Sequence, residues 1–107
     1  MAFDGELDDR IADVVLPWGA TRKKMFGGTC YLLNGNMVAG VHKDYLIARL
    51  GEQEGAAALE EPFVEAFDIT GKPMKGWVMV GPKGVGGAEL ERWLDRARTF
   101  VSSLPAK

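Results

Sequence analysis

The chain has 107 residues, of which 47% are hydrophobic and 26% charged, which is typical of one globular domain spanning residues 1–107. Its net charge of −2 gives no overall electrostatic reason to expect nucleic-acid binding. One cysteine excludes an intramolecular disulfide, and the acidic N-terminus lacks the basic and apolar runs of a signal peptide. We therefore expect a cytoplasmic protein that does not enter a membrane.

A first amphipathic helix is predicted over residues 4–16. Its apolar stripe recurs at spacings of three and four residues: Leu7, Ile11, Val14 and Trp18. Asp8 and its acidic neighbours lie off this stripe. Asp4 is the predicted N-cap, and Pro17 ends the helix.

Residues 22–50 are predicted to form three short strands joined by two tight turns. Gly27 and Gly28 lie inside the first strand, where glycine lowers stability, so they indicate a bulge or a close backbone approach. Asn34-Gly35 predicts a two-residue hairpin, because both positions of a type I′ turn require positive φ. Cys30 falls on an apolar strand face and is predicted to be a buried structural cysteine.

The rest of the chain predicts a short helix over 52–59, strands over 63–69 and 76–80, and a glycine-rich loop over 81–87. A final helix over 88–103 carries a clean apolar stripe: Leu90, Trp93, Leu94, Ala97, Val101 and Leu104. The element order is α-β-β-β-α-β-β-α. It predicts a two-layer α+β domain, with a five-stranded, mostly antiparallel sheet covered by helices.

No residues form a convincing catalytic or metal-binding set. His42, the one histidine, falls in a predicted hairpin turn, and one histidine with one cysteine excludes a zinc site of the usual Cys/His type. The paired carboxylates lie in loops or on helix faces without an apolar pocket: Asp8-Asp9, Glu52/Glu54 and Glu60-Glu61. The 81–87 loop matches neither phosphate-binding glycine motif. We expect no catalytic residue, no metal and no cofactor.

A basic cluster is the one candidate binding site. Arg22, Lys23 and Lys24 would join Lys72 and Lys75 if two predicted turns lay at one end of the sheet. Together they would bind an anion or an acidic partner. The alternative is a solvated strand entry, whose charges discourage edge-to-edge pairing of sheets.

The segment Thr21-Arg22-Lys23-Lys24-Met25-Phe26-Gly27-Gly28 resembles the leading motif of the TfoX/Sxy N-terminal domain family. Further agreement comes from the Asn34-Gly35 hairpin, from residues 71–77 and from the final helix, so that the resemblance covers residues 7–104. The residues assigned to its structural motif are Met25, Phe26, Gly27, Gly28, Asn34, Gly35, Gly71, Pro73 and Met74.

The resemblance implies the same α-β-β-β-α-β-β-α order, found in regulators of competence genes that act with the cyclic-AMP receptor protein. Full-length members carry a second, C-terminal helical domain, so this chain is expected to be a stand-alone member. The family supplies no catalytic residues. The leading hypothesis is a non-enzymatic regulatory or interaction module with a protein partner. The alternatives are a small-ligand or phosphate binder using the basic cluster and a direct DNA-binding accessory protein. Homodimerisation stays open.

Overall fold

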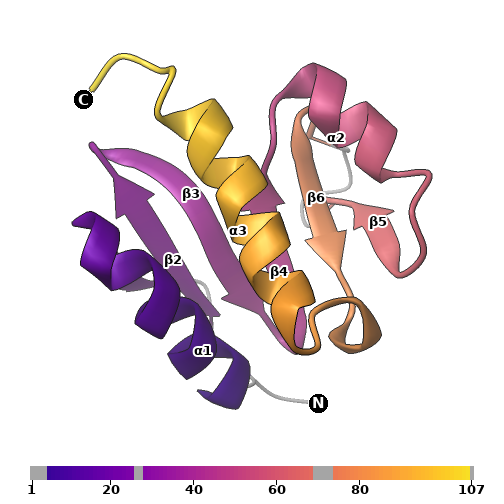
Figure 1. Cartoon of the computed structure of the whole chain (residues 1–107), viewed down its shortest axis with the longest axis horizontal. Helices are drawn as coiled ribbons and strands as arrows, with labels where there is room; N and C mark the ends of the chain where they lie inside the picture. Colours follow the sequence, from indigo (N-terminus) through magenta and orange to yellow (C-terminus); the bar gives the residue numbers. More distant parts are fainter. Residues whose placement is uncertain (1–4, 26–27, 69–73, 107) are drawn as a thin grey trace.

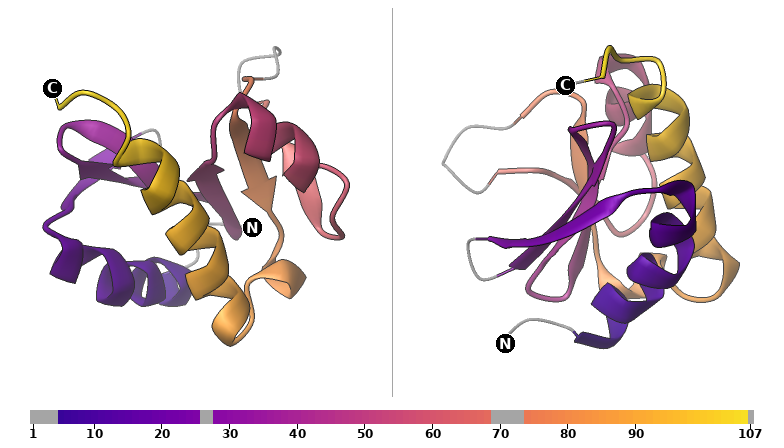
Figure 2. Two further views of the ribbon diagram at one scale, coloured as in Figure 1. Left: turned by 45° about the horizontal axis from the view of Figure 1, so that its top comes forward. Right: turned by 90° about the vertical axis from the view of Figure 1, so that its left-hand side faces the viewer.

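The computed structural model describes residues 5–25, 28–68 and 74–106. Several residues singled out in the sequence lie outside these ranges: Asp4, Phe26, Gly27, Gly71, Lys72 and Pro73. Within the described residues, one layer is an antiparallel sheet and the other is three helices (Figure 1). Viewed from the side, all three helices lie on the same face of the sheet (Figure 2). The predicted two-layer α+β class is confirmed.

The described sheet has six strands in the order β1-β2-β3-β4-β6-β5. They are β1 (Thr21–Met25), β2 (Gly28–Leu33), β3 (Asn36–His42), β4 (Tyr45–Arg49), β5 (Val64–Ala66) and β6 (Trp77–Val80). The helices are α1 (Gly5–Val15), α2 (Glu52–Ala58) and α3 (Ala88–Val101), with short 3₁₀ turns η1 (Leu16–Trp18) and η2 (Pro82–Gly84).

The sixth strand corrects the prediction of five. Residues 21–25 form an edge strand that pairs with β2 along its length, from Thr21 opposite Leu32 to Met25 opposite Gly28. A charged run without alternation gives no strand signal. It is nevertheless suited to the edge of a sheet, where exposed lysines discourage pairing with another chain.

The apolar stripe of α3 packs as predicted, with Leu90, Trp93, Leu94, Ala97 and Val101 all buried. The stripe of α1 is rotated from the predicted one, because Val14 and Trp18 are only half-buried. Its buried residues are Leu7, Asp8, Ile11, Ala12 and Val15. Asp8, predicted to lie off the buried face, is 1% exposed. None of these helices is long and apolar enough to cross a membrane.

Turn and glycine chemistry sets the central hairpins. Asn34 and Gly35 have φ of 55° and 82°, which confirms the predicted type I′ signal between β2 and β3. Gly28 marks a close backbone approach, because a Cβ there would lie 2.1 Å from the Val41 carbonyl oxygen. The strand irregularity falls elsewhere, between Tyr31 and Leu32.

Candidate functional site

Arg22, the first residue of the predicted basic cluster, is bound within the fold. Its guanidinium donates to the buried carboxylate of Asp8 and, at 3.5 Å, to Asp9. The hydrogen bond to Asp8 raises the pKa of Arg22. Tyr31 completes the network by donating its hydroxyl to Asp8 Oδ1 at 2.5 Å, and burial is the main cause of the raised pKa of this tyrosine. Arg22 therefore joins α1 to the sheet.

The other described cations of the cluster do not gather around Arg22. Lys24 shares its strand face, whereas Lys23 points to the opposite face because side chains alternate along a strand. Lys75 precedes β6, which is separated from β1 by three intervening strands. Four strand spacings amount to roughly 19 Å. The structure thus does not bring Lys75 together with Arg22, Lys23 and Lys24, and Lys72 lies outside the described residues.

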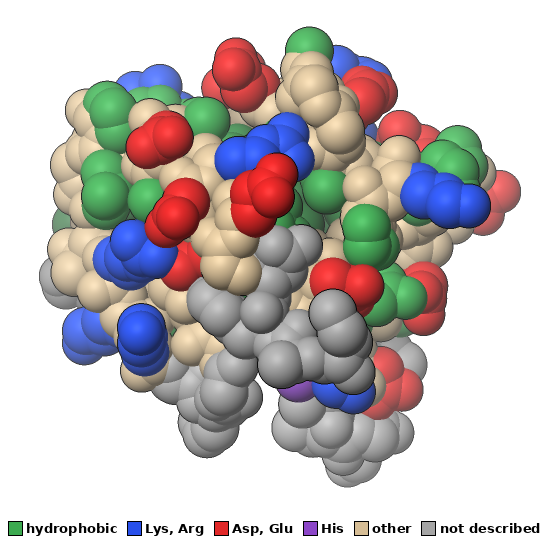
Figure 3. Space-filling model, turned by 90° about the horizontal axis from the view of Figure 1, so that it is seen from below, with side chains coloured by type: hydrophobic (Ala, Val, Ile, Leu, Met, Phe, Trp, Pro, Cys, Tyr) green, Lys and Arg blue, Asp and Glu red, His purple; other side chains and the backbone are tan. Residues whose placement is uncertain are grey.

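The surface shown in Figure 3 is mixed in charge. Lysine and arginine side chains lie among aspartate and glutamate, with a small group of basic side chains at the lower left, and hydrophobic side chains lie between them. Over the described part of this face, no broad basic patch forms. The described part of this face therefore offers no broad basic surface for a phosphate backbone.

The remaining chemical candidates have ordinary surroundings. Cys30 is 2% exposed within the sheet, and burial raises the pKa of its thiol, which disfavours the reactive thiolate. His42 ends β3 rather than lying in the turn, and it is half-buried. Among the described residues, no three His, Cys, Asp or Glu side chains are placed to hold a metal ion.

A groove beside α2 is one of several hollows on the surface of the described structure. It lies between α2 and the chain entering β6. Its apolar lining includes Ala56, Leu59, Ala66 and Met74, and Glu52 and Lys75 also line it. Its volume is about 280 Å³, close to the lower limit for ligand sites. We call it the α2–β6 groove.

Two glycines build this groove. A Cβ on Gly55 would lie 3.0 Å from the Cα of Gly76, so the helix and the strand entry touch backbone to backbone. Gly76 also has φ of 85°, and its carbonyl accepts hydrogen bonds from the N–H groups of Leu50 and Gly51. This close approach holds the middle of α2 against the entry to β6, and Leu59 lies just beyond the C-terminal end of the helix.

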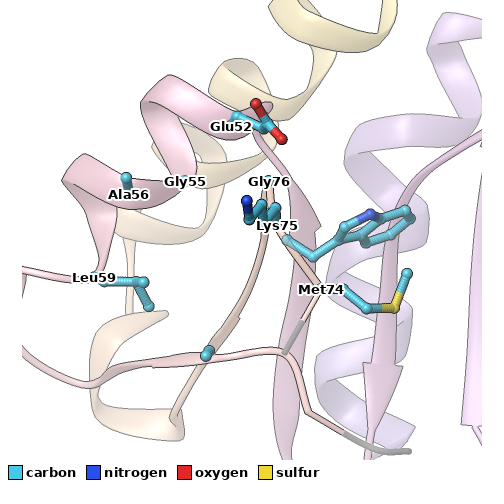
Figure 4. A pocket seen from close by; sticks show the side chains of 9 residues that line it. Glu52, Gly55, Ala56, Leu59, Met74, Lys75 and Gly76 are labelled. Carbon is cyan, nitrogen blue, oxygen red and sulfur yellow. The ribbon is translucent and has the colours of Figure 1, made fainter. Parts of the chain in front are cut away.

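The close-up shows how the groove is lined (Figure 4). Leu59 projects from the end of α2 towards the gap, while Glu52 and Lys75 lie near each other at the upper end. Leu59 is 42% exposed and Met74 is 44% exposed. Most large hydrophobic side chains of the described residues are buried, so two such exposed side chains along one groove form a candidate docking surface.

A second hollow of about 200 Å³ adjoins the groove and shares Glu52, Lys75, Gly76 and Trp77 with it. We call it the Arg49 hollow. The Arg49 guanidinium lies 5.1 Å from the ring centre of Trp77 and 5.7 Å from that of Phe100. Two aromatic rings thus hold a cation beside the apolar groove.

Sequence reasoning did not identify Arg49 or Leu59 as site residues and assigned Met74 only to a structural motif. The one sequence feature that pointed to this site was Gly55. A glycine inside a short helix weakens the helix, which indicates that close packing requires a glycine at that position. Its partner Gly76 is far away in the chain. Only the tertiary fold shows that the two meet.

A comparison with models of protein families identifies the family of the chain. The model of the TfoX N-terminal domain matches residues 17–101, from η1 through the end of α3. The chain belongs to the TfoX N-terminal domain family. This match is narrower than the resemblance over 7–104 and leaves α1 outside it. No curated protein and no solved structure matches the chain.

Proposed function

We propose that this TfoX N-terminal domain is a non-enzymatic regulatory module that binds a protein partner through the α2–β6 groove. The observation that carries the proposal is the pair of large apolar side chains, Leu59 and Met74, exposed along one groove. Membership of the TfoX N-terminal domain family supports a role resembling that of competence regulators.

Partner capture tests this proposal. We expect Leu59→Asp to reduce capture of a specific partner at least about tenfold, because a buried leucine contributes about 1.5–3 kcal/mol and a charge there opposes docking. Immobilised wild-type and variant domains would be exposed to native cytoplasm, and the retained proteins identified and quantified by mass spectrometry.

Leu16→Asp is the matched control. Leu16 is also 42% exposed, but it follows α1, on the far side of α3 from α2 (Figure 1). It should leave capture unchanged. Equal capture by both variants, or loss of capture with Leu16→Asp alone, would show that the groove is not the docking surface.

A reproducible turnover of a substrate, abolished by one polar substitution, would contradict the proposed non-enzymatic role. Light scattering of the wild type distinguishes a second copy of the chain from a different partner.

A further inference from the structure

Two cations at one end of the α2–β6 groove have no carboxylate partner among the described residues. Among the described residues, the arginines that form ion pairs are Arg22, Arg92 and Arg96. Neither Arg49 nor Lys75 forms such a pair, although both line the Arg49 hollow. Glu52 is the one carboxylate among the residues lining this hollow. The two cations therefore outnumber it, and the lining of the hollow carries a net positive formal charge.

The two rings around Arg49 hold the guanidinium without consuming its hydrogen bonds. Trp77 and Phe100 contact the cation through their ring faces, at 5.1 and 5.7 Å. Guanidinium N–H groups point outward in the plane of the group and match the two oxygens of a carboxylate. A half-buried arginine held in this way is prepared to receive an anion.

Ring stacking alone does not make such a site, as Arg98 illustrates. Its guanidinium lies 4.6 Å from the ring centre of Trp18, and it also has no ion pair among the described residues. Arg98 is exposed on α3, however, and its aromatic partner follows α1 rather than α2. What distinguishes Arg49 is the shared wall between its hollow and an apolar groove.

We infer that the α2–β6 groove and the Arg49 hollow together recognise a partner segment in which a large apolar side chain lies beside a carboxylate. The apolar side chain packs against Leu59 in the α2–β6 groove, and the carboxylate accepts hydrogen bonds from Arg49 and Lys75. The inference rests on the proposed function and specifies the chemistry of its partner. Charge complementarity selects an acidic segment over a basic or neutral one.

Selection from a random dodecapeptide library displayed on phage tests this inference. Parallel selections would use the wild-type domain, Arg49→Gln, Lys75→Gln and the control Arg98→Gln, each first shown to be folded by circular dichroism. From the wild type and Arg98→Gln we expect peptides with a large apolar residue within two positions of Asp or Glu. From Arg49→Gln and Lys75→Gln we expect the apolar preference without the acidic one.

A synthetic peptide from the wild-type selection gives the size of the effect. It should bind about 5- to 10-fold more tightly than its Asn or Gln counterpart, and 0.5 M salt should reduce this difference. Arg49→Gln should remove the difference, and Arg49→Lys should restore part of it. The inference is overturned if no peptide is enriched, if acidic residues are not enriched, or if Arg49→Gln keeps the acidic preference. Loss of capture with Leu59→Asp would leave the proposed function standing in each of these cases.

Discussion

Replacing Arg22 with methionine should lower the free energy of unfolding by about 2 to 4 kcal/mol, because it leaves a buried carboxylate without its cation. The side chain of Asp8 is 2% exposed and accepts from both Arg22 and Tyr31. Methionine keeps most of the arginine stem, so packing is largely preserved while the charge is lost. Urea unfolding followed by tryptophan fluorescence would measure the change.

Lys24→Met is the matched control, since Lys24 shares the strand face and is exposed. It should change stability by no more than about 0.5 kcal/mol. Adding Asp8→Asn to Arg22→Met should recover part of the loss, because no charge then stays buried. If Arg22→Met and Lys24→Met lower the free energy of unfolding by equally small amounts, Arg22 is not a structural residue. Arg22 would then again be a candidate for a binding cluster.

Gly28→Ala should destabilise the domain by about 3 kcal/mol, equivalent to a fall in melting temperature of roughly 10–20 °C. The added Cβ would lie 2.1 Å from the Val41 carbonyl oxygen and 3.3 Å from its carbon. Both are backbone atoms, so a strand must move and no side-chain rotation relieves the clash. Thermal unfolding by circular dichroism measures the shift.

Gly86→Ala provides the comparison for Gly28→Ala. Nothing lies within 4 Å of a Cβ built on Gly86, and its φ is outside the left-handed region. Alanine there should be neutral or slightly stabilising, because it restricts the unfolded chain. A melting temperature for Gly28→Ala within 3 °C of the wild type would show that β2 and β3 can separate there without loss.

The sequence predicted those features whose signals are local. Asn34-Gly35 specifies its turn because few residues other than glycine and asparagine adopt positive φ readily. The stripe of α3 repeats over nearly four turns, so its buried face could be read without knowing what covers it. Cys30 was correctly predicted to be buried from its place on an apolar strand face, although residues on both faces of β2 are buried.

Features that depend on contacts across the fold were missed. The charged run over 21–25 became a strand because β2 offered it a partner, and Asp8 became buried because Tyr31 and Arg22 satisfied its oxygens. From sequence alone, a carboxylate is predicted to face solvent, because burial requires hydrogen-bond partners that only the fold reveals.

The candidate site could not be predicted for the same reason. Grouping Lys75 with Arg22 assumed that two turns lie at one end of the sheet, side by side. The strand order instead places β2, β3 and β4 between them. The α2–β6 groove depends on Gly55 meeting Gly76, a contact between segments about twenty residues apart that no periodicity encodes.

Chemical-shift mapping is the most direct measurement of whether the α2–β6 groove is the docking surface. The ¹⁵N-labelled domain would be titrated with the captured partner while the three tryptophan indole signals are followed. The Trp77 indole and residues 52–59 and 74–77 should shift. The Trp93 indole, which donates to the Gly84 carbonyl at 3.1 Å, should stay unchanged, as should Trp18. Shifts gathered on β1 or around Trp18, with Trp77 unaffected, would contradict the account.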